Sequence, residues 1–403
     1  MATRKTKGAK GGGTIRQRPD GRWEARYTLG IDPGTGKQIQ KSVYGKTQKE
    51  VRQKLTAITA EIDSGTYILQ DKTTLEQWLN IWLDEYMGDK KYGTIRNYKI
   101  ACKYHIIPYM GKYRLSDLKP HMIQTLYNRL YRGEDGEKPL SAKTIRNVHG
   151  VLSKALNQAI WNGMIRTNPA QLTTLPRKVR KDIQTLTDEQ IKQFFVVVER
   201  DSYRSILKFI LFSGVRESEA IGLTWDCIDF ERGTIRIYHQ LLQRPKSEGG
   251  YTLAPLKNDR ERLLTPPPTL LALLKERKHE QMQQRMKAGL AWHGWGSAEE
   301  QNTWFVFTTE FGDHYCPQTV YDHFKRIARQ IGAEKANVHS LRHTYAVLCL
   351  QNGDDVKTVQ SNLGHATAAF TLDVYGHVSG KMRQDSANRM EAYLQRTIFG
   401  RQA

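Results

Sequence analysis

The run His339-Ser340-Leu341-Arg342 lies in the last quarter of the chain, and it is followed by Leu363-Gly364-His365 and by Tyr375. These segments combine a phenol with a guanidinium group and two imidazoles. Any one of these side chains is more often a packed or solvated residue than a catalytic one. The order and spacing of the whole set are what indicate a reaction centre.

Two further candidates lie upstream of this run. Arg216 stands in the stretch Ser213-Gly214-Val215-Arg216-Glu217-Ser218-Glu219. Lys257 follows a predicted strand over residues 251–256 and precedes the turn Asn258-Asp259. Lys246 competes with Lys257, because a lysine in a hairpin is usually only solvated. A complete centre therefore needs segments that are far apart in the sequence.

This combination of side chains suits attack on a phosphodiester without a metal ion. A scissile phosphate gains negative charge on its non-bridging oxygens, and planar guanidinium groups such as Arg216 and Arg342 match that charge. A free phenol has a pKa of about 10, so Tyr375 needs nearby cations and a proton acceptor before it can attack. His339 and His365 are the candidates for that environment.

A metal-dependent alternative fits the sequence poorly. His339 and His343 have the i, i+4 spacing of a zinc-binding helix, but Ser340 and Leu341 stand where a zinc peptidase carries its glutamate. No carboxylate cluster of the two-metal nuclease kind lies near them in the sequence. The segment 34–37, Gly-Thr-Gly-Lys, lacks the rest of a P-loop and is predicted to be a hairpin turn. We therefore expect no metal site and no cofactor.

From about residue 187 to 390 the chain resembles the tyrosine recombinases, the phage-integrase family. The resemblance rests on five elements in the family's order: Gly214-Val215-Arg216-Glu217-Ser218-Glu219, Lys257 in a sheet hairpin, His339-Ser340-Leu341-Arg342, Leu363-Gly364-His365 and Tyr375. It implies a site-specific DNA recombinase or integrase that cuts and rejoins strands through a 3′-phosphotyrosine at Tyr375. It further implies excision and integration of a mobile element in a bacterium.

The same resemblance implies a role for each candidate. Arg216 and Arg342 would clamp the phosphate, His339 would act as the acid/base, and His365 would hydrogen-bond the phosphate. Lys257 would protonate the departing 5′ hydroxyl.

Three other side chains near these residues in the sequence have less direct roles. Glu219 either orients a basic side chain or backbone amide, or forms a structural ion pair. His343 and His377 are expected to be structural.

Two rival functions remain open from the sequence. A type IB topoisomerase-like enzyme shares the chemistry but lacks sequence choice and synapsis, and a basic N-terminal module argues against it. An inactive DNA-binding regulator is the second rival. The intact set of six side chains argues against a regulator, but a sequence does not measure turnover.

The composition favours a polyanionic partner. The chain has 403 residues, with 62 Lys and Arg against 41 Asp and Glu and a formal net charge of +21. No apolar segment is long enough to span a membrane, and the first residues lack the apolar stretch of a signal peptide, so we expect a cytoplasmic protein without a membrane partner. Four scattered cysteines are expected to be reduced: Cys102, Cys227, Cys316 and Cys349.

Residues 1–66 are predicted to form a basic arm-type DNA-binding domain with a disordered tail. Strands are expected over residues 14–18, 23–29 and 38–44, followed by a helix over residues 47–64. This layout resembles the arm-binding domain of conjugative-transposon integrases. The candidate DNA contacts here are Arg16, Arg18, Arg22, Trp23, Arg26 and Lys41, although a merely solvated sheet face is the alternative.

Residues 72–170 are predicted to form a helical domain that resembles the family's core-binding domain, which implies a core-type DNA-binding role. Helices are expected from residue 75, where Thr74 and Gln77 form a capping box, and over residues 94–104, 119–132 and 142–161. Arg96, Lys99, Lys143 and Arg146 are candidate phosphate contacts, with a solvated helix start as the alternative. A basic linker is expected over residues 171–186.

Residues 187–403 are predicted to form the catalytic domain, a mixed α/β fold in a multidomain and mainly α chain with small β elements. Strands over residues 234–239, 251–256 and 261–264 are expected to form one small antiparallel sheet. A final helix over residues 379–399 either folds back on its own domain or packs onto a neighbouring protomer as an oligomerisation helix. The resemblance implies double-stranded DNA with arm-type and core-type sites, a tetramer on DNA, and accessory DNA-bending or excision proteins as partners.

Overall fold

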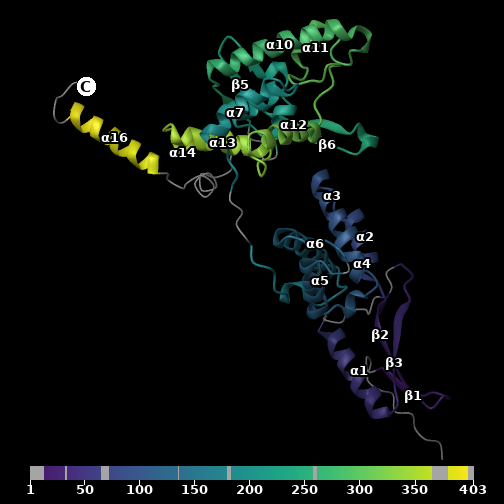
Figure 1. The fold of residues 1–403 in the computed structure, drawn as a ribbon. Helices are drawn as coiled ribbons and strands as arrows, with labels where there is room; N and C mark the ends of the chain where they lie inside the picture. The colour runs from purple at the N-terminus through teal and green to yellow at the C-terminus, as the bar shows by residue number, and fades with distance from the viewer. Residues whose placement is uncertain are drawn as a thin grey trace, which may run out of the picture. The chain divides into compact units, whose positions relative to one another are not determined.

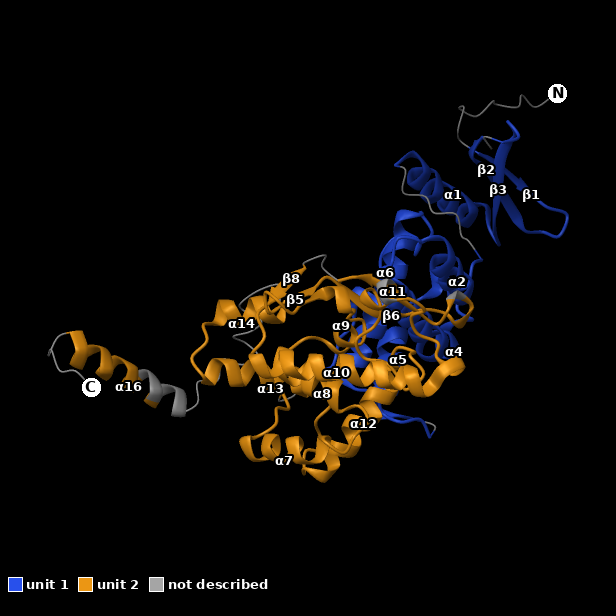
Figure 2. Cartoon of the chain, turned by 90° about the horizontal axis from the view of Figure 1, so that it is seen from above, with its two compact units in different colours: residues 1–179 blue, residues 180–403 orange. Residues whose placement is uncertain are grey.

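The computed structural model describes residues 13–31, 34–64, 72–134, 136–178, 183–256, 261–364 and 380–397. The chain divides into two compact units, residues 1–179 and residues 180–403 (Figures 1 and 2). This division lies within the predicted linker over residues 171–186. None of the helices in the described ranges is long and apolar enough to cross a membrane.

The first unit begins with a three-stranded antiparallel sheet in the order β1-β2-β3. Its strands are β1 (Thr14–Gln17), β2 (Trp23–Ile31) and β3 (Gln38–Gly45), and α1 (Gln48–Asp63) covers one face. Thr47 caps α1 by accepting a hydrogen bond from the Glu50 amide. Ala25 and Tyr27 of β2 pack against Val51 and Leu55 of α1, which leaves the other face of the sheet to solvent. The predicted strands and helix are confirmed to within two residues at their ends.

The rest of the first unit is a helical bundle with its own core. Its elements are α2 (Leu75–Glu85), α3 (Tyr92–Ile100), the π-helix η1 (Ala101–Ile106), α4 (Ile107–Met110), the 3₁₀ turn η2 (Leu115–Asp117), α5 (Pro120–Arg132), α6 (Ala142–Trp161) and the 3₁₀ turn η3 (Pro169–Leu172). Trp78 is buried at the centre, where its indole N–H donates to the carbonyl of Ala155 at 2.8 Å.

The predicted helix over residues 94–104 is too short. Helical structure continues from α3 through η1 to Met110, although Pro108 has no N–H to donate. The amide of Ile107 bonds to the carbonyl of Cys102, a wide π-type turn directly before the proline.

Both ends of the predicted linker are attached to folded structure. Gln124 of α5 exchanges two hydrogen bonds with the backbone of Thr174, at 2.7 and 3.1 Å. On the other side, the amide of Leu186 donates to Thr344 Oγ1 at 2.9 Å. Thr174 and Leu186, near the two ends of residues 171–186, therefore contact the folded part of the chain.

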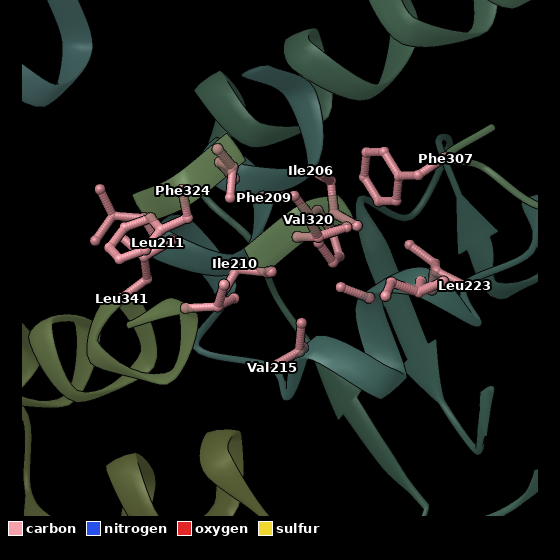
Figure 3. Close-up of a cluster of buried hydrophobic side chains, with 14 of the residues drawn as sticks. Ile206, Phe209, Ile210, Leu211, Val215, Leu223, Phe307, Val320, Phe324 and Leu341 are labelled. Carbon is pink, nitrogen blue, oxygen red and sulfur yellow. The ribbon is translucent and has the colours of Figure 1, made fainter. Parts of the chain in front are cut away.

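The second unit is organised around one large apolar core. Its helices and helical turns are α7 (Asp188–Val198), α8 (Arg204–Ser213), α9 (Glu217–Ile221), η4 (Trp225–Cys227), η5 (Lys246–Glu248), α10 (Pro268–Ala288), η6 (Gly289–Ala291), α11 (Ala298–Asn302), α12 (Pro317–Gln330), α13 (Val338–Gln351), α14 (Val356–Leu363) and α16 (Gly380–Thr397). Phe209 of α8, Phe324 of α12 and Leu341 of α13 meet in this core without solvent exposure (Figure 3). The core thus fixes α8, which leads into the turn before Arg216, and α13, which carries His339 and Arg342.

The predicted single sheet of the second unit is wrong, because the strands form two sheets. β4 (Ile228–Asp229), β5 (Thr234–Ile237) and β8 (Arg262–Leu264) pair in the order β4-β5-β8. β6 (His239–Gln243) and β7 (Tyr251–Pro255) pair only with each other. The strand β6 was not predicted, since His-Gln-Leu-Leu-Gln has no apolar and polar alternation.

Gly214, between α8 and α9, has a conformation and a location that only glycine fits. Its φ is +65°, and a Cβ atom built there would lie 2.2 Å from Cδ1 of Tyr345 and 2.9 Å from Cδ2 of Leu363. The glycine thus lets the α8–α9 turn approach α13 and α14.

Gly214→Ala is expected to lower the free energy of unfolding of the second unit by at least about 2 kcal/mol, from backbone strain and overpacking together. Gly332→Ala is the control, because Gly332 also has a positive φ of +67° but nothing lies within 4 Å of the added Cβ. Urea denaturation compares the two variants. Equal losses would contradict the steric part of the argument.

Candidate active site

Arg216 follows the Gly214 turn and begins α9. Its backbone N–H donates to Glu219 Oε2 at 2.9 Å, and its Nη1 donates to Glu219 Oε1 at 2.7 Å. The side chain of Arg216 is 39% exposed, whereas that of Glu219 is 1% exposed. One edge of this guanidinium group is therefore fixed by a buried carboxylate while the side chain still reaches solvent.

Glu219 binds a second arginine, Arg262 of β8. Arg262 Nη2 lies 2.5 Å from Glu219 Oε2, and both side chains are buried. Burial opposes ionisation of Glu219, but the hydrogen bond and charge of Arg262, together with Arg216, outweigh it and lower the pKa of the carboxyl to about 2. The sequence left two interpretations of Glu219, orientation of a basic side chain or a structural ion pair. The structure shows both, because Glu219 orients Arg216 and forms a buried ion pair with Arg262.

Three arginines bind three consecutive carbonyl groups at the carboxyl end of α14. Arg262 Nε donates to the carbonyl of Asn362 at 2.8 Å, Arg342 Nη2 to that of Leu363 at 2.7 Å, and Arg216 Nη2 to that of Gly364 at 3.3 Å. The last carbonyls of a helix lack partners within the helix and carry partial negative charge, so cations stabilise them. This arrangement fixes the chain at the residue that precedes His365.

Arg342 also ties this region to the α8–α9 turn. It is 1% exposed, and its Nη1 donates to the carbonyl of Gly214 at 2.8 Å. The side chain comes from the second turn of α13, whose first turn is held by a capping box between Asn337 and Ser340. Arg342 thereby connects α13, α14 and the turn that carries Arg216.

His339 lies on the first turn of α13 with an exposed edge. Desolvation by the surrounding protein, and then the charges of Arg342 and Arg216, lower its pKa to about 4. The ring of His343 meets it edge-on with centroids 4.6 Å apart, and burial followed by the charge of His339 lowers the pKa of His343 to about 4 as well. Both imidazoles are therefore neutral at pH 7, and His339 has a nitrogen that can accept a proton.

The structure brings together three of the six predicted catalytic residues: Arg216, His339 and Arg342. Lys257, His365 and Tyr375 lie outside the described residues, as does His377. Among the described residues, no group of three or more His, Cys, Asp or Glu side chains is placed to hold a metal ion.

Arg262 is a site residue that was missed from the sequence. A usable signal was present, because Arg262 and Leu264 share the inward phase of a short strand, while Leu263 between them is 63% exposed. A charged residue in an inward position needs a buried partner of opposite charge. That partner is Glu219, already singled out beside Arg216.

The predicted DNA contacts of the sheet lie on different faces. Arg16 and Arg26 lie on the face opposite α1, and Arg18 lies over the ring of Tyr44 on that same face. Arg22 lies in the β1–β2 turn and pairs with Asp20. Trp23 instead packs against the core beneath α1.

Lys41 is paired with Tyr27, so it points to the α1 side as well. Strand alternation therefore places the candidate contacts of the sheet on two faces.

The predicted contacts of the helical bundle are all exposed. Arg96 and Lys99 lie on α3, and Lys143 and Arg146 lie on the first turns of α6. Arg146 Nε donates to the carbonyl of Pro176 at 3.0 Å. Their role in binding DNA remains a prediction.

Comparison with known proteins identifies the family. The profile described as the phage integrase family matches residues 184–382, and the phage integrase N-terminal SAM-like domain matches residues 74–131. Together the two profiles cover more than half of the chain. The chain belongs to the phage integrase family and is a tyrosine recombinase, an enzyme of site-specific DNA recombination.

Similar proteins extend over nearly the whole chain. A tyrosine recombinase XerC-like protein of Caldanaerobacter subterraneus is 27% identical, covering 91% of this chain and 95% of its own length. An integrase of Saccharopolyspora erythraea is 25% identical over 98% and 99% of the two chains.

Among solved structures, the Tn1549 transposon integrase in complex with transposon right end DNA is 20% identical. It matches with a TM-score of 0.65 and covers 79% of this chain and 99% of its own. A lambda integrase tetramer bound to a Holliday junction is 18% identical and matches with a TM-score of 0.54, covering 91% and 96%. These structures support the fold described above.

Glu219→Gln is expected to reduce the free energy of unfolding by roughly 3–5 kcal/mol, because Arg262 would remain buried without an anion. The wild-type carboxyl stays ionised in the folded state down to about pH 2 but takes up a proton near pH 4.5 when unfolded. Its contribution is therefore complete above about pH 4.5 and is lost as the pH falls toward 2.

Urea denaturation between about pH 3 and pH 7 measures the difference between wild type and Glu219→Gln, which should shrink below about pH 4.5. Glu231→Gln, at an exposed position of the same unit, is the control. A difference that does not change with pH would refute the assigned role of the carboxylate.

Proposed function

We propose that this recombinase cuts and rejoins DNA strands through a covalent 3′-phosphotyrosine at Tyr375, for the excision and integration of a mobile element. The observation that carries this proposal is the attachment of the α14 carboxyl end to Arg216, Arg342 and Arg262. His365 follows Gly364 directly in the sequence. The geometry thus supports a site in which His365 joins Arg216, Arg342 and His339.

In the proposed first step, the oxygen of Tyr375 attacks the scissile phosphorus and the bond to the 5′ oxygen breaks. Arg216 and Arg342 stabilise the charge that grows on the non-bridging oxygens. The phenol proton passes to His339, which is neutral at pH 7 because its pKa is about 4. The departing 5′ oxygen takes a proton from Lys257.

In the reverse direction, a 5′ hydroxyl from another strand attacks the phosphotyrosine and Tyr375 leaves. The ester bond to tyrosine replaces a phosphodiester, so strand joining needs no nucleotide cofactor.

The hairpin of β6 and β7 supports Lys257 over Lys246 as the general acid. Its open end is fixed near Arg216 by Gln240, whose amide donates to the carbonyl of Pro255 at 3.0 Å while Ser218 donates to Gln240 Oε1 at 3.2 Å. Ser218 lies two residues after Arg216, and Lys257 lies two residues after Pro255.

Lys246 lies at the closed end of the same hairpin, beyond the pair Gln243–Tyr251. The five-residue strand β6 separates the two ends by about 3.3 Å per residue. The chain returns from Lys257 to β8, where Arg262 binds Glu219. The connectivity therefore favours Lys257.

The proposed substrate is double-stranded DNA, read at arm-type sites by the sheet and at core-type sites by the helical bundle. Joining two duplexes requires four active sites, so we propose a tetramer on DNA in which α16 packs between protomers. Accessory DNA-bending or excision proteins are proposed partners. For a DNA substrate of this kind we propose a location in the bacterial cytoplasm, at the nucleoid when the enzyme is bound to DNA.

Wild-type protein incubated with nicked site DNA and EDTA is expected to form a covalent protein–DNA adduct, seen as a shifted band in a denaturing gel. Tyr375→Phe should abolish this adduct while DNA binding persists, because phenylalanine lacks the attacking oxygen. Tyr321→Phe is the control, since Tyr321 is an exposed tyrosine of α12, away from the site and from α16.

Three results would count against the proposed reaction. An adduct that survives Tyr375→Phe would identify another nucleophile. Binding without cleavage under all conditions would favour a regulator. Equal relaxation of any supercoiled plasmid, without joining of two sites, would favour a type IB topoisomerase.

Substrates with sulfur in place of the scissile 5′ oxygen test the general acid. A thiolate leaves without protonation, so Lys257→Met should lose cleavage of ordinary DNA by about 100-fold or more and regain it on the sulfur substrate. Lys246→Met is the matched control and should cleave both substrates like wild type. Rescue of Lys246→Met instead would reassign the general acid to Lys246.

A further inference from the structure

Glu24 lies on the solvent face of the N-terminal sheet, between Arg16 and Arg26. On β2 it is paired with Arg16 of β1 on one side and with Tyr44 of β3 on the other. Its side chain is 3% exposed, because the side chains around it cover it. A carboxylate in this place is unexpected for a surface that has only to attract a polyanion.

The carboxylate of Glu24 binds two arginines, each through the Nε atom of its guanidinium group. Arg16 Nε lies 2.7 Å from Oε2, and Arg26 Nε lies 3.4 Å from Oε1. Ser42 Oγ donates to Oε1 at 2.9 Å, and Tyr44 Oη donates to it at 3.4 Å. The hydrogen bond of Arg16 is the main cause that lowers the pKa of Glu24 to about 2, so the group is ionised at neutral pH.

Both arginines present the far end of the guanidinium group to solvent. Glu24 engages Nε of each group, and no hydrogen bond from Nη1 or Nη2 of Arg16 or Arg26 to another described residue is present, so these atoms can serve an acceptor outside the protein. Arg16 and Arg26 keep 54% and 48% of their side-chain surface exposed. Arg18 is held beside them by the ring of Tyr44, with its Cζ atom 5.6 Å from the ring centroid.

Charge alone does not explain this arrangement. Glu24 cancels one positive charge on the surface, which weakens contacts with phosphates wherever the DNA is bound. A fixed guanidinium fork, in contrast, is the group that reads guanine, through two hydrogen bonds to O6 and N7 in the major groove. Fixing the side chain beforehand also reduces the entropy lost when the contact forms.

We infer that Glu24 is a positioning residue that aims Arg16 and Arg26 at guanines in the major groove, so that the sheet reads sequence as well as phosphates. This inference rests on the proposed function of the sheet as the arm-site reader. Arg16 and Arg26 are diagonal neighbours on adjacent strands, about 7–8 Å apart in the backbone and somewhat closer between Cβ atoms. Their two guanines should therefore lie about two base steps apart, at about 3.4 Å per step.

The test is selection from a random duplex library with the full-length chain carrying Tyr375→Phe, which prevents covalent capture. We expect a guanine-containing motif that is separate from the motif of the core-type site. Arg16→Lys and Arg26→Lys keep the charge but lose the fork. Each should reduce the preference for guanine over adenine at one position by about 5- to 150-fold, without changing the slope of affinity against salt.

Glu24→Gln removes the anion that aims the two arginines. It should reduce the same preference at both positions, while affinity for random duplex DNA stays equal or increases because one negative charge is gone. Arg52→Lys, at an exposed position of α1 on the other side of the sheet, is the matched control and should keep the motif. Circular dichroism checks the fold of each variant, and the two lysine variants suffice if Glu24→Gln does not fold.

Several outcomes would overturn the inference. They are the absence of a guanine motif outside the core-type site, an unchanged preference in both lysine variants, and a Glu24→Gln variant that binds all DNA more tightly with its preference intact. Tighter binding of all DNA by Glu24→Gln with an unchanged preference would show that the sheet contacts only phosphates. An adduct at Tyr375 without a guanine motif refutes only this inference, and a guanine motif without an adduct refutes only the proposed reaction.

Discussion

The buried carboxylate of Glu219 is the interaction on which the second unit depends. It holds Arg216 and Arg262 at once, and these two arginines together with Arg342 bind the last carbonyls of α14. Desolvation of the carboxylate opposes this arrangement, but two guanidinium groups compensate for it, as the lowered pKa of Glu219 shows. Elements far apart in the sequence therefore meet at one charge, and the segment after Gly364 begins at a fixed point beside Arg216.

Much of this organisation could be predicted from local sequence signals. The capping boxes at Thr74 and Thr187, the apolar spacing of α2 and the turn after Arg18 define elements through interactions within a few residues. The motif around Arg216 and the run from His339 to Arg342 also indicated their chemistry, because these side chains recur in a known order. Interactions between residues close in the sequence were therefore sufficient to predict these helices and turns and to name candidate catalytic residues.

The pairing of distant segments could not be predicted in the same way. β5 pairs with β8 across the whole β6–β7 hairpin, and nothing in the strand sequences specifies that choice over one continuous sheet. Arg262 was missed because its role depends on Glu219, which reaches it only through tertiary folding. The face of Lys41 is fixed in a related way, since the side of a strand is set by which residues α1 covers. In each case the missing information was the identity of the partner.

Glu24 and Glu219 show the same physical solution in two units with separate cores. In each, a carboxylate shielded from solvent engages two arginines. Arg16 and Arg26 at Glu24, and Arg216 at Glu219, keep an exposed surface for a polyanionic substrate, whereas Arg262 is buried. A nearby carboxylate weakens attraction to any phosphate, so it is favourable only where the direction of a guanidinium group matters more than its charge.

A single scissile phosphate requires guanidinium groups of fixed direction, because its transition state has a fixed geometry. The edge of a guanine requires them too, because two hydrogen bonds must form together. The recurrence of this arrangement in the sheet is therefore an argument that the sheet reads bases, since contact with phosphates alone would be stronger without Glu24.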